Sequence, residues 1–147
     1  MSPGKLDLKV IGDRLELAVR LLGELRALPS DSLTAFLADR RNVPAAESLL
    51  RRTIEALFDT LRHILAKRHG FGGLEYRQVA KKAIEQELVQ DVHLAGRLPE
   101  IAGFRNRLTH FYQEVTAEEL FDILRDHLGD LETLAEELRP LCEGTDP

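Results

Sequence analysis

Apolar residues return at every third or fourth position along most of this chain, and this spacing is the feature that most restricts its fold. The clearest run lies at residues 43–68, where one helix face collects Leu50, Ile54, Leu57, Phe58, Leu61 and Leu65. No stretch shows the period-two alternation of apolar and polar residues that is typical of a half-buried strand. The sequence therefore predicts an all-α protein, an antiparallel up-and-down bundle of four to five helices with short loops.

Capping residues and helix breakers divide the pattern into elements. Asn42 and Asp91 are placed to cap the helices that follow them, and a capping box begins at Thr116. Pro99 lies inside a helical pattern and predicts a kink or a short break. The glycines at 70–73 lack the Gly-Lys-Ser/Thr ending of a phosphate loop, so they indicate a helix stop. Helices are expected at 6–28, 32–39, 43–68, 76–88, about 91–110 and 116–138, with 43–68 as the central one.

The chain has 147 residues, the size of one domain. We expect a single domain over 1–147, with an ordered core at about 5–139 and a frayed tail at 140–147. No apolar run approaches the ~18 residues of a membrane span, and the first residues contain no apolar signal core. A cytoplasmic protein without membrane contact is therefore expected.

The net charge of −5 argues against a protein that coats nucleic acid with a large basic surface, so any contact with RNA must be local. The single cysteine, Cys142, cannot form an internal disulfide, and the five histidines include no His-x-x-x-His pair. Neither a metal site nor a cofactor is expected. Basic pairs form either the polar faces of helices or a groove that leads to Arg105: Arg40-Arg41, Arg51-Arg52, Lys67-Arg68 and Lys81-Lys82.

Residues 103–112, Gly-Phe-Arg-Asn-Arg-Leu-Thr-His-Phe-Tyr, form the only segment that looks like a site. Read as a helix, its core-facing stripe would consist of Ile101, Phe104, Leu108 and Phe111, with Tyr112 at the border. The opposite arc would carry Arg105, Asn106, Thr109 and His110. Arg105 and His110 are some ~140° apart around an ideal helix, so they meet only if Arg105 bends across or a second copy approaches.

Arg105 and His110 together suit RNA cleavage without a metal ion. Histidine can transfer a proton at neutral pH, and a guanidinium presents a planar fork of donors to phosphate oxygens. In that reaction the ribose 2′-hydroxyl attacks the adjacent phosphorus, His110 assists by proton transfer, and Arg105 neutralises the pentacoordinate phosphate. The product carries a 2′,3′-cyclic phosphate. On residue types alone, a solvated helix face is the more common explanation of such a pattern.

The segment from Arg105 to Tyr112 resembles the Arg-x4-His-x-Tyr motif of HepT-like toxins, a branch of the HEPN superfamily of helical ribonucleases. Residues 32–40, 47–65 and 103–106 are also similar to that family, so the resemblance covers nearly the whole chain. It implies a HEPN-like bundle that works as a homodimer. It also implies the toxin of a type VII (HEPN/MNT) toxin-antitoxin pair, whose nucleotidyltransferase antitoxin adds AMP to the motif tyrosine, here Tyr112.

Residues outside the motif offer further support for its chemistry. On the helix at 43–68, Glu55, Asp59 and His63 form an i,i+4 ladder, and Arg62 can pair with Asp59. A surface ladder is the simpler interpretation. The resemblance makes a second one plausible, in which Asp59 or His63 supports the Arg105/His110 group, as do the neighbouring side chains Asn106 and Thr109.

The sequence thus favours a metal-independent endoribonuclease toxin that acts on RNA as a homodimer and is neutralised by a nucleotidyltransferase antitoxin. AMP on Tyr112 would place an anionic group beside Arg105 and His110, where it would compete with the RNA phosphate. The alternative is a catalytically silent HEPN module that binds a nucleotidyltransferase or another protein. The intact pair of Arg105 and His110 favours the enzyme, because a binding module has no chemical need of it.

Overall fold

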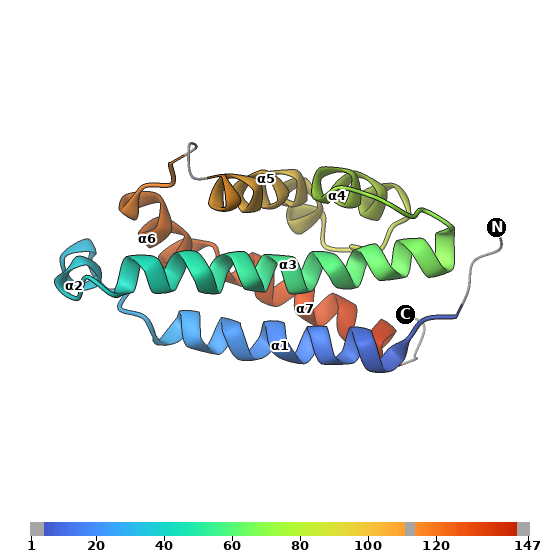
Figure 1. The fold of residues 1–147 in the computed structure, drawn as a ribbon, viewed down its shortest axis with the longest axis horizontal. Coiled ribbons are helices and arrows are strands. Elements are labelled where there is room, and N and C mark those ends of the chain that lie inside the picture. Colours follow the sequence, from blue (N-terminus) through green and yellow to red (C-terminus); the bar gives the residue numbers. More distant parts are fainter. Residues whose placement is uncertain (1–4, 111–113, 144–147) are drawn as a thin grey trace.

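The computed structural model of the protein describes residues 5–110 and 114–143. Over these residues the chain is helical and contains no strand, so the predicted all-α class is confirmed (Figure 1). None of the described helices combines the length and the apolar character needed to cross a membrane. The helices are α1 (Leu8–Ala27), α2 (Leu33–Ala38), α3 (Asn42–His69), α4 (Tyr76–Glu85), α5 (Val92–Thr109), α6 (Ala117–Asp126) and α7 (Leu128–Cys142).

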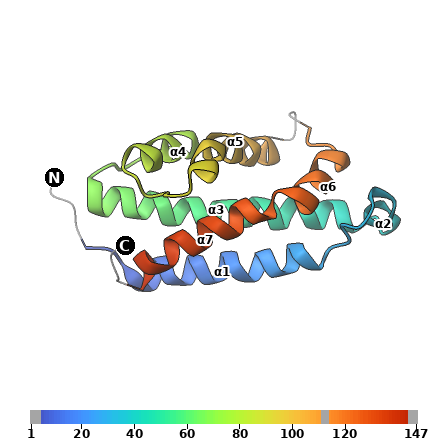
Figure 2. The same cartoon turned by 180° about the vertical axis from the view of Figure 1, so that it is seen from behind.

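Helix α3 is the central element, because it contacts each of the other six helices. Helix α1 runs along one side of it, while α4 and α5 lie on the other side and pack against each other (Figure 1). Helix α7 crosses diagonally over α1 and α3 on the reverse face (Figure 2). The predicted core face of α3 is buried throughout: Leu50, Ile54, Leu57, Phe58, Leu61 and Leu65. Each such side chain contributes ~1.5–3 kcal/mol of hydrophobic stabilisation, which confirms the long helix as the support of the fold.

The predicted caps at Asp91 and Thr116 are confirmed, and the predicted cap at Asn42 is wrong. The Asp91 carboxylate accepts the backbone N–H of Leu94 at 2.8 Å, and Thr116 forms the expected capping box. Asn42 is instead the first residue of α3, and its buried amide donates to the carbonyl oxygen of Phe36 at 2.9 Å. The side chain therefore ties α2 to α3 rather than capping a helix.

Several helix ends differ from the prediction. Helix α4 stops at Glu85 because Glu87 takes a left-handed conformation with φ 55°. The expected final helix is two helices, broken at His127, whose φ of −124° departs from helical geometry. Helix α5 continues through Pro99, and α7 runs on to the buried Cys142, beyond the expected end of the ordered core near 139. The break at His127 turns the six expected helical segments into the seven helices of the described residues, more than the four to five of the predicted bundle.

The buried stripe of α5 is not the one expected from the motif. Leu94, Leu98 and Ala102 are buried, whereas Ile101, Phe104 and Leu108 are only partly buried against the core. Phe111 and Tyr112 lie outside the described residues. Because residues three or four apart share a helix face, the observed stripe continues from Ala102 to Arg105. The arginine therefore faces α3 and not the opposite, solvent-exposed arc.

Candidate active site

An open, polar pocket of about 430 Å³ lies where α3, α4 and α5 meet. Helix α5 ends at Thr109, and His110 follows it in extended conformation, with φ −105° and ψ 99°. Since His110 leaves the helix, the ~140° separation of an ideal helix no longer applies, and Arg105 and His110 line the same pocket within one chain. The pocket walls are formed by Arg62, Leu74, Glu75, Tyr76, Arg105, Asn106 and His110.

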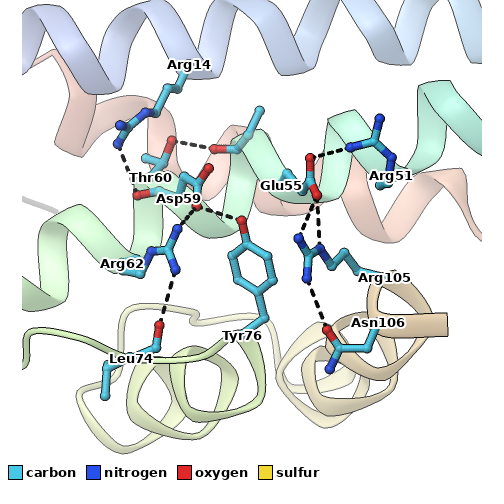
Figure 3. A network of polar contacts seen from close by, with 11 residues as sticks. Arg14, Arg51, Glu55, Asp59, Thr60, Arg62, Leu74, Tyr76, Arg105 and Asn106 are labelled. Carbon is cyan, nitrogen blue, oxygen red and sulfur yellow. Dashed lines mark hydrogen bonds and ion pairs between the residues drawn. The ribbon is translucent and has the colours of Figure 1, made fainter. Parts of the chain in front are cut away.

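The guanidinium of Arg105 is fixed by a carboxylate from α3. Its Nε and Nη2 atoms donate to Glu55 Oε2 at 3.0 and 2.8 Å, and its Nη1 donates to Asn106 Oδ1 at 3.3 Å (Figure 3). The other Glu55 oxygen accepts from Arg51 at 2.9 Å. The Arg105 and Glu55 side chains are only 24% and 22% exposed, so solvent screens this pair less than a surface ion pair.

The ring of Tyr76 is a fixed platform for two guanidinium groups. The guanidinium carbons of Arg105 and Arg62 lie 4.4 and 4.9 Å from its centroid, within the range of cation–π attraction. The ring is buried edge-on against Phe58, and its hydroxyl donates to Asp59 Oδ1 at 2.8 Å (Figure 3). Burial, followed by the hydrogen bond to Asp59, raises the pKa of Tyr76 to about 12, so the phenol stays protonated at neutral pH.

Asp59 lies beside the pocket, and its link to Arg105 passes through Tyr76. The same carboxylate oxygen that accepts from Tyr76 also accepts from Arg62, which confirms the predicted Arg62–Asp59 pair. The Nη1 atom of Arg62 donates to the carbonyl oxygen of Leu74 at 3.2 Å (Figure 3). Asp59 therefore holds both the aromatic platform and the second guanidinium in place.

The structure separates His63 from the Arg105/His110 pair. Its Nε2 atom accepts the backbone N–H of Asp7, just before α1, at 3.0 Å. It lines a different pocket together with Arg14. Of the two residues predicted to support the Arg105/His110 group, the structure thus places Asp59 beside the Arg105 pocket and His63 beside α1.

The remaining motif residues have different surroundings. Asn106 lines the pocket and accepts from Arg105, whereas the exposed Thr109 donates its hydroxyl to the Asn106 carbonyl oxygen at 2.9 Å. His110 is exposed, and its backbone N–H donates to the same carbonyl oxygen at 3.2 Å. The predicted modification site, Tyr112, lies outside the described residues.

Sequence patterns did not reveal three residues that shape the pocket: Glu55 as the partner of Arg105, Tyr76 as its platform, and Arg62 as a second cation in the wall. Glu55 stands 50 positions before Arg105, so no local spacing links them. A usable signal for Tyr76 was its position at the start of a helix after the glycine-rich break. In the described part of the chain, no three His, Cys, Asp or Glu side chains are grouped so that they could hold a metal ion.

The fold and the pocket define an all-helical protein with an arginine and a histidine in one polar pocket at the end of a helix. A profile of the ribonuclease HepT-like family matches residues 16–138. The chain therefore belongs to the HepT-like ribonuclease family, and the predicted endoribonuclease class is confirmed.

Individual relatives agree with this assignment. The chain is 29% identical over 113 residues to the tRNA nuclease HepT of Aphanizomenon flos-aquae (strain 2012/KM1/D3), which covers 76% of each protein. The fold of this chain is also similar to that of the tri-AMPylated Shewanella oneidensis HEPN toxin in complex with MNT antitoxin. The TM-score is 0.77 and the sequence identity 21%, and the match covers 88% of this chain and 96% of that toxin chain. A toxin-antitoxin structure with AMP-PNP gives a TM-score of 0.75 and 20% identity over 89% and 98% of the two chains.

Proposed function

We propose that this protein is a cytoplasmic RNA-cleaving toxin of a toxin-antitoxin pair, and that it works at the Arg105/His110 pocket without a metal ion. The observation that carries the proposal is that both residues line one open pocket, in which Glu55 and Tyr76 fix the guanidinium. The positioned fork neutralises the charge that builds on the phosphate, and His110 transfers the proton. The ribose 2′-oxygen loses its proton and bonds to phosphorus, the bond to the 5′-oxygen breaks, and that oxygen takes up a proton. The products are a 2′,3′-cyclic phosphate and a 5′-hydroxyl.

The hydrogen bonds of Arg105 indicate where the phosphate would bind. Its Nε and Nη2 atoms are committed to Glu55, whereas its Nη1 bond to Asn106 is longer, at 3.3 Å. A phosphate oxygen is a stronger, charged acceptor than an amide oxygen and would replace Asn106 at Nη1. Asn106 would then serve as the resting partner of the catalytic guanidinium.

Cleavage of transfer RNA in EDTA tests this function, and the relative named as a tRNA nuclease supports that choice of substrate. We expect cleavage to persist in EDTA and to leave cyclic phosphate ends. His110→Ala should lower the rate by ~10²–10⁴, and Arg105→Lys should also be poor because an ammonium lacks the fork. His93→Ala, on the same helix with a 75% exposed side chain, is the matched control and should cleave normally.

Two results would overturn the catalytic assignment: a strict requirement for a divalent ion, or full activity in His110→Ala. Binding to a nucleotidyltransferase without cleavage of any RNA would support the silent-module alternative.

The proposed regulator is a nucleotidyltransferase antitoxin that adds AMP to Tyr112. The similar fold of an AMPylated HEPN toxin bound to its MNT antitoxin supports this. The chain has two tyrosines, and the other, Tyr76, is buried with its hydroxyl bound to Asp59, so it is a poor acceptor. After incubation with the cognate enzyme and ATP, intact mass should show AMP on the wild type and on Tyr76→Phe. An adduct that survives in Tyr112→Phe would exclude this site.

The proposed working unit is a homodimer with the two motif helices near a two-fold axis. One chain already brings Arg105 and His110 to one pocket, so the second copy is not needed to complete the pair. Instead it would cover the open side of the pocket beside the exposed His110. Light scattering at micromolar concentration should give twice the chain mass, and a fully active monomer would exclude this arrangement.

A further inference from the structure

A second pocket, of about 240 Å³, lies beside the Arg105 pocket, and Arg62 lines both. Arg14 enters it from α1, while the other walls come from α3. Two guanidinium groups from different helices therefore face one small open space. The lining residues of this second pocket are Arg14, Asp59, Arg62, His63 and Ala66.

The acid in this pocket does not offset both arginines. The Asp59 carboxylate accepts hydrogen bonds from Arg62 and from Tyr76, so its negative charge is already paired with Arg62. Arg14 donates to the backbone carbonyl oxygen of Asp59 at 3.4 Å, and this acceptor carries no formal charge (Figure 3). The pocket thus contains one arginine neutralised by a carboxylate and one that a neutral acceptor holds in place.

The positive charges around this pocket also act on the neighbouring His63. Burial, and then the charges of Arg14 and Lys67, lower the pKa of His63, although Asp7 acts in the opposite direction. The ring uses Nε2 to accept the backbone N–H of Asp7, which also requires that this nitrogen be unprotonated. An anion bound in this pocket would relieve the repulsion between the cations.

We propose that Arg14 and Arg62 form a phosphate subsite for a single RNA strand, which holds the phosphodiester next to the one that is cleaved. The inference rests on the proposed function, because Arg105 is assigned to the cleaved phosphate. Arg105 and Arg62 lie 4.4 and 4.9 Å from the centroid of the same Tyr76 ring, which stands between them in Figure 3, and both line the Arg105 pocket. A strand can pass from Arg105 over Tyr76 to Arg62 and Arg14, with one phosphate at each pocket.

Binding is measured in a His110→Ala background, in which the RNA remains intact. Fluorescence anisotropy with a short labelled single strand is recorded over a series of salt concentrations. Adding Arg14→Gln should lower the affinity about tenfold and reduce the salt slope by ~0.7, the value for one lost phosphate contact on a single strand. Arg20→Gln, an exposed arginine on the same helix, is the control and should leave the slope unchanged.

A neutral methylphosphonate placed at each linkage in turn identifies the phosphate that Arg14 contacts. A methylphosphonate beside the cleaved linkage should lower the RNA affinity of the His110→Ala protein about tenfold. It should not lower the affinity of the protein that also carries Arg14→Gln any further. At distant linkages its effect should be the same in both proteins. Arg14→Lys, which keeps the charge without the fork, should retain the salt slope with intermediate affinity, and melting curves confirm that each variant is folded.

Three results would overturn the subsite: unchanged affinity in Arg14→Gln, a loss that is the same wherever the neutral linkage stands, or a loss of antitoxin binding with RNA binding intact. Failure of the proposed function is distinguishable, because it appears as a wild-type protein that cuts no RNA. The binding assay is performed without cleavage and reports on the subsite separately.

Discussion

Two of the three arginines of helix α5, Arg97 and Arg105, lie in similar settings, and of these two only Arg105 opens onto a polar pocket. Arg105 pairs with Glu55 of α3, while Arg97 lies 3.3 Å from Asp130 of α7. Their side chains are almost equally buried, at 24% and 28% exposure. Arg97 even contacts a histidine directly, with its Nη2 atom 3.2 Å from His127 Nδ1. Residue types and ion pairing alone therefore do not distinguish the surroundings of Arg105 from those of Arg97.

The space in front of each guanidinium separates them. Arg105 shares a pocket of about 430 Å³ with Asn106, His110 and Arg62. Arg97 lines a pocket of about 110 Å³, and its Nη1 binds Glu100 at 3.0 Å, while its buried Nε has no hydrogen bond of good geometry. The smaller pocket has largely apolar walls: Leu50, Ile54, Ile101, Phe104, Ile123 and Leu131. An arginine beside a histidine becomes a candidate site only where a phosphate has room to reach the donors.

The largest contrast is expected from truncating each arginine. Arg105→Ala should lower kcat/KM for RNA by ~10²–10³, the usual cost of removing one donor to a developing oxyanion. It should cost little stability, because Glu55 keeps its ion pair with Arg51. Arg97→Ala should cleave RNA at the wild-type rate but lose ~1–3 kcal/mol in the free energy of unfolding, because Asp130, 15% exposed, loses its partner. Cleavage rates and urea unfolding check both. A folded but inactive Arg97→Ala would remove the distinction between the two regions.

A smaller contrast is expected from the carboxylates. Glu55→Gln keeps an acceptor but not the charge that orients Arg105, so we expect kcat to fall ~10-fold with KM nearly unchanged. Asp130→Asn should leave kcat alone. Steady-state kinetics on one RNA substrate distinguishes the outcomes. A Glu55→Gln protein faster than wild type would mean that Glu55 restrains Arg105 from the phosphate and does not position it.

Two substitutions of Tyr76 distinguish the effect of its aromatic ring from that of its hydroxyl hydrogen bond. Tyr76→Phe keeps the ring beneath Arg105 and Arg62 and loses the hydroxyl bond to Asp59, so it should cost ~1 kcal/mol of stability and retain most activity. Tyr76→Leu also removes the cation–π contacts, worth ~0.5–2 kcal/mol, and should lower both activity and stability. Equal activity in the two variants would show that the ring does not orient the guanidinium.

Local patterns predicted the parts of the fold that local interactions decide. The core face of α3 and the caps at Asp91 and Thr116 follow from side chains within a turn or two of each other. The buried face of α5 did not follow, because stripes through Ala102 and through Phe104 both repeat with helical spacing. Packing against α3 determines which of the two stripes is buried, and the sequence of α5 alone does not contain that information.

The candidate site divides in the same way. Arg105, Asn106 and His110 belong to one short motif, and the sequence brought them together as candidates. Glu55 and Tyr76 join them only when α3 and α4 pack against α5, so no spacing in the sequence pointed to them. The roles of these residues in cleavage remain predictions that the variants above address.

The smallest effect concerns His63, which lies outside the Arg105 pocket and lines the second pocket with Arg14 and Arg62. Its lowered pKa means that the unfolded chain binds more protons than the folded chain once the pH falls below about 6.5, the ordinary histidine value. The free energy of unfolding should therefore decrease as the pH falls from about 6.5 through the lowered pKa, and this contribution should be constant above about pH 7.5. The lowered carboxylate pKa values of Glu119 and Glu132 act at more acidic pH, below the usual glutamate range.

In His63→Gln this part of the pH dependence should disappear, whereas His93→Gln, at an exposed position on α5, should retain it. Urea unfolding at a series of pH values measures the difference, and identical slopes in His63→Gln and wild type would show that protonation of His63 is not linked to folding.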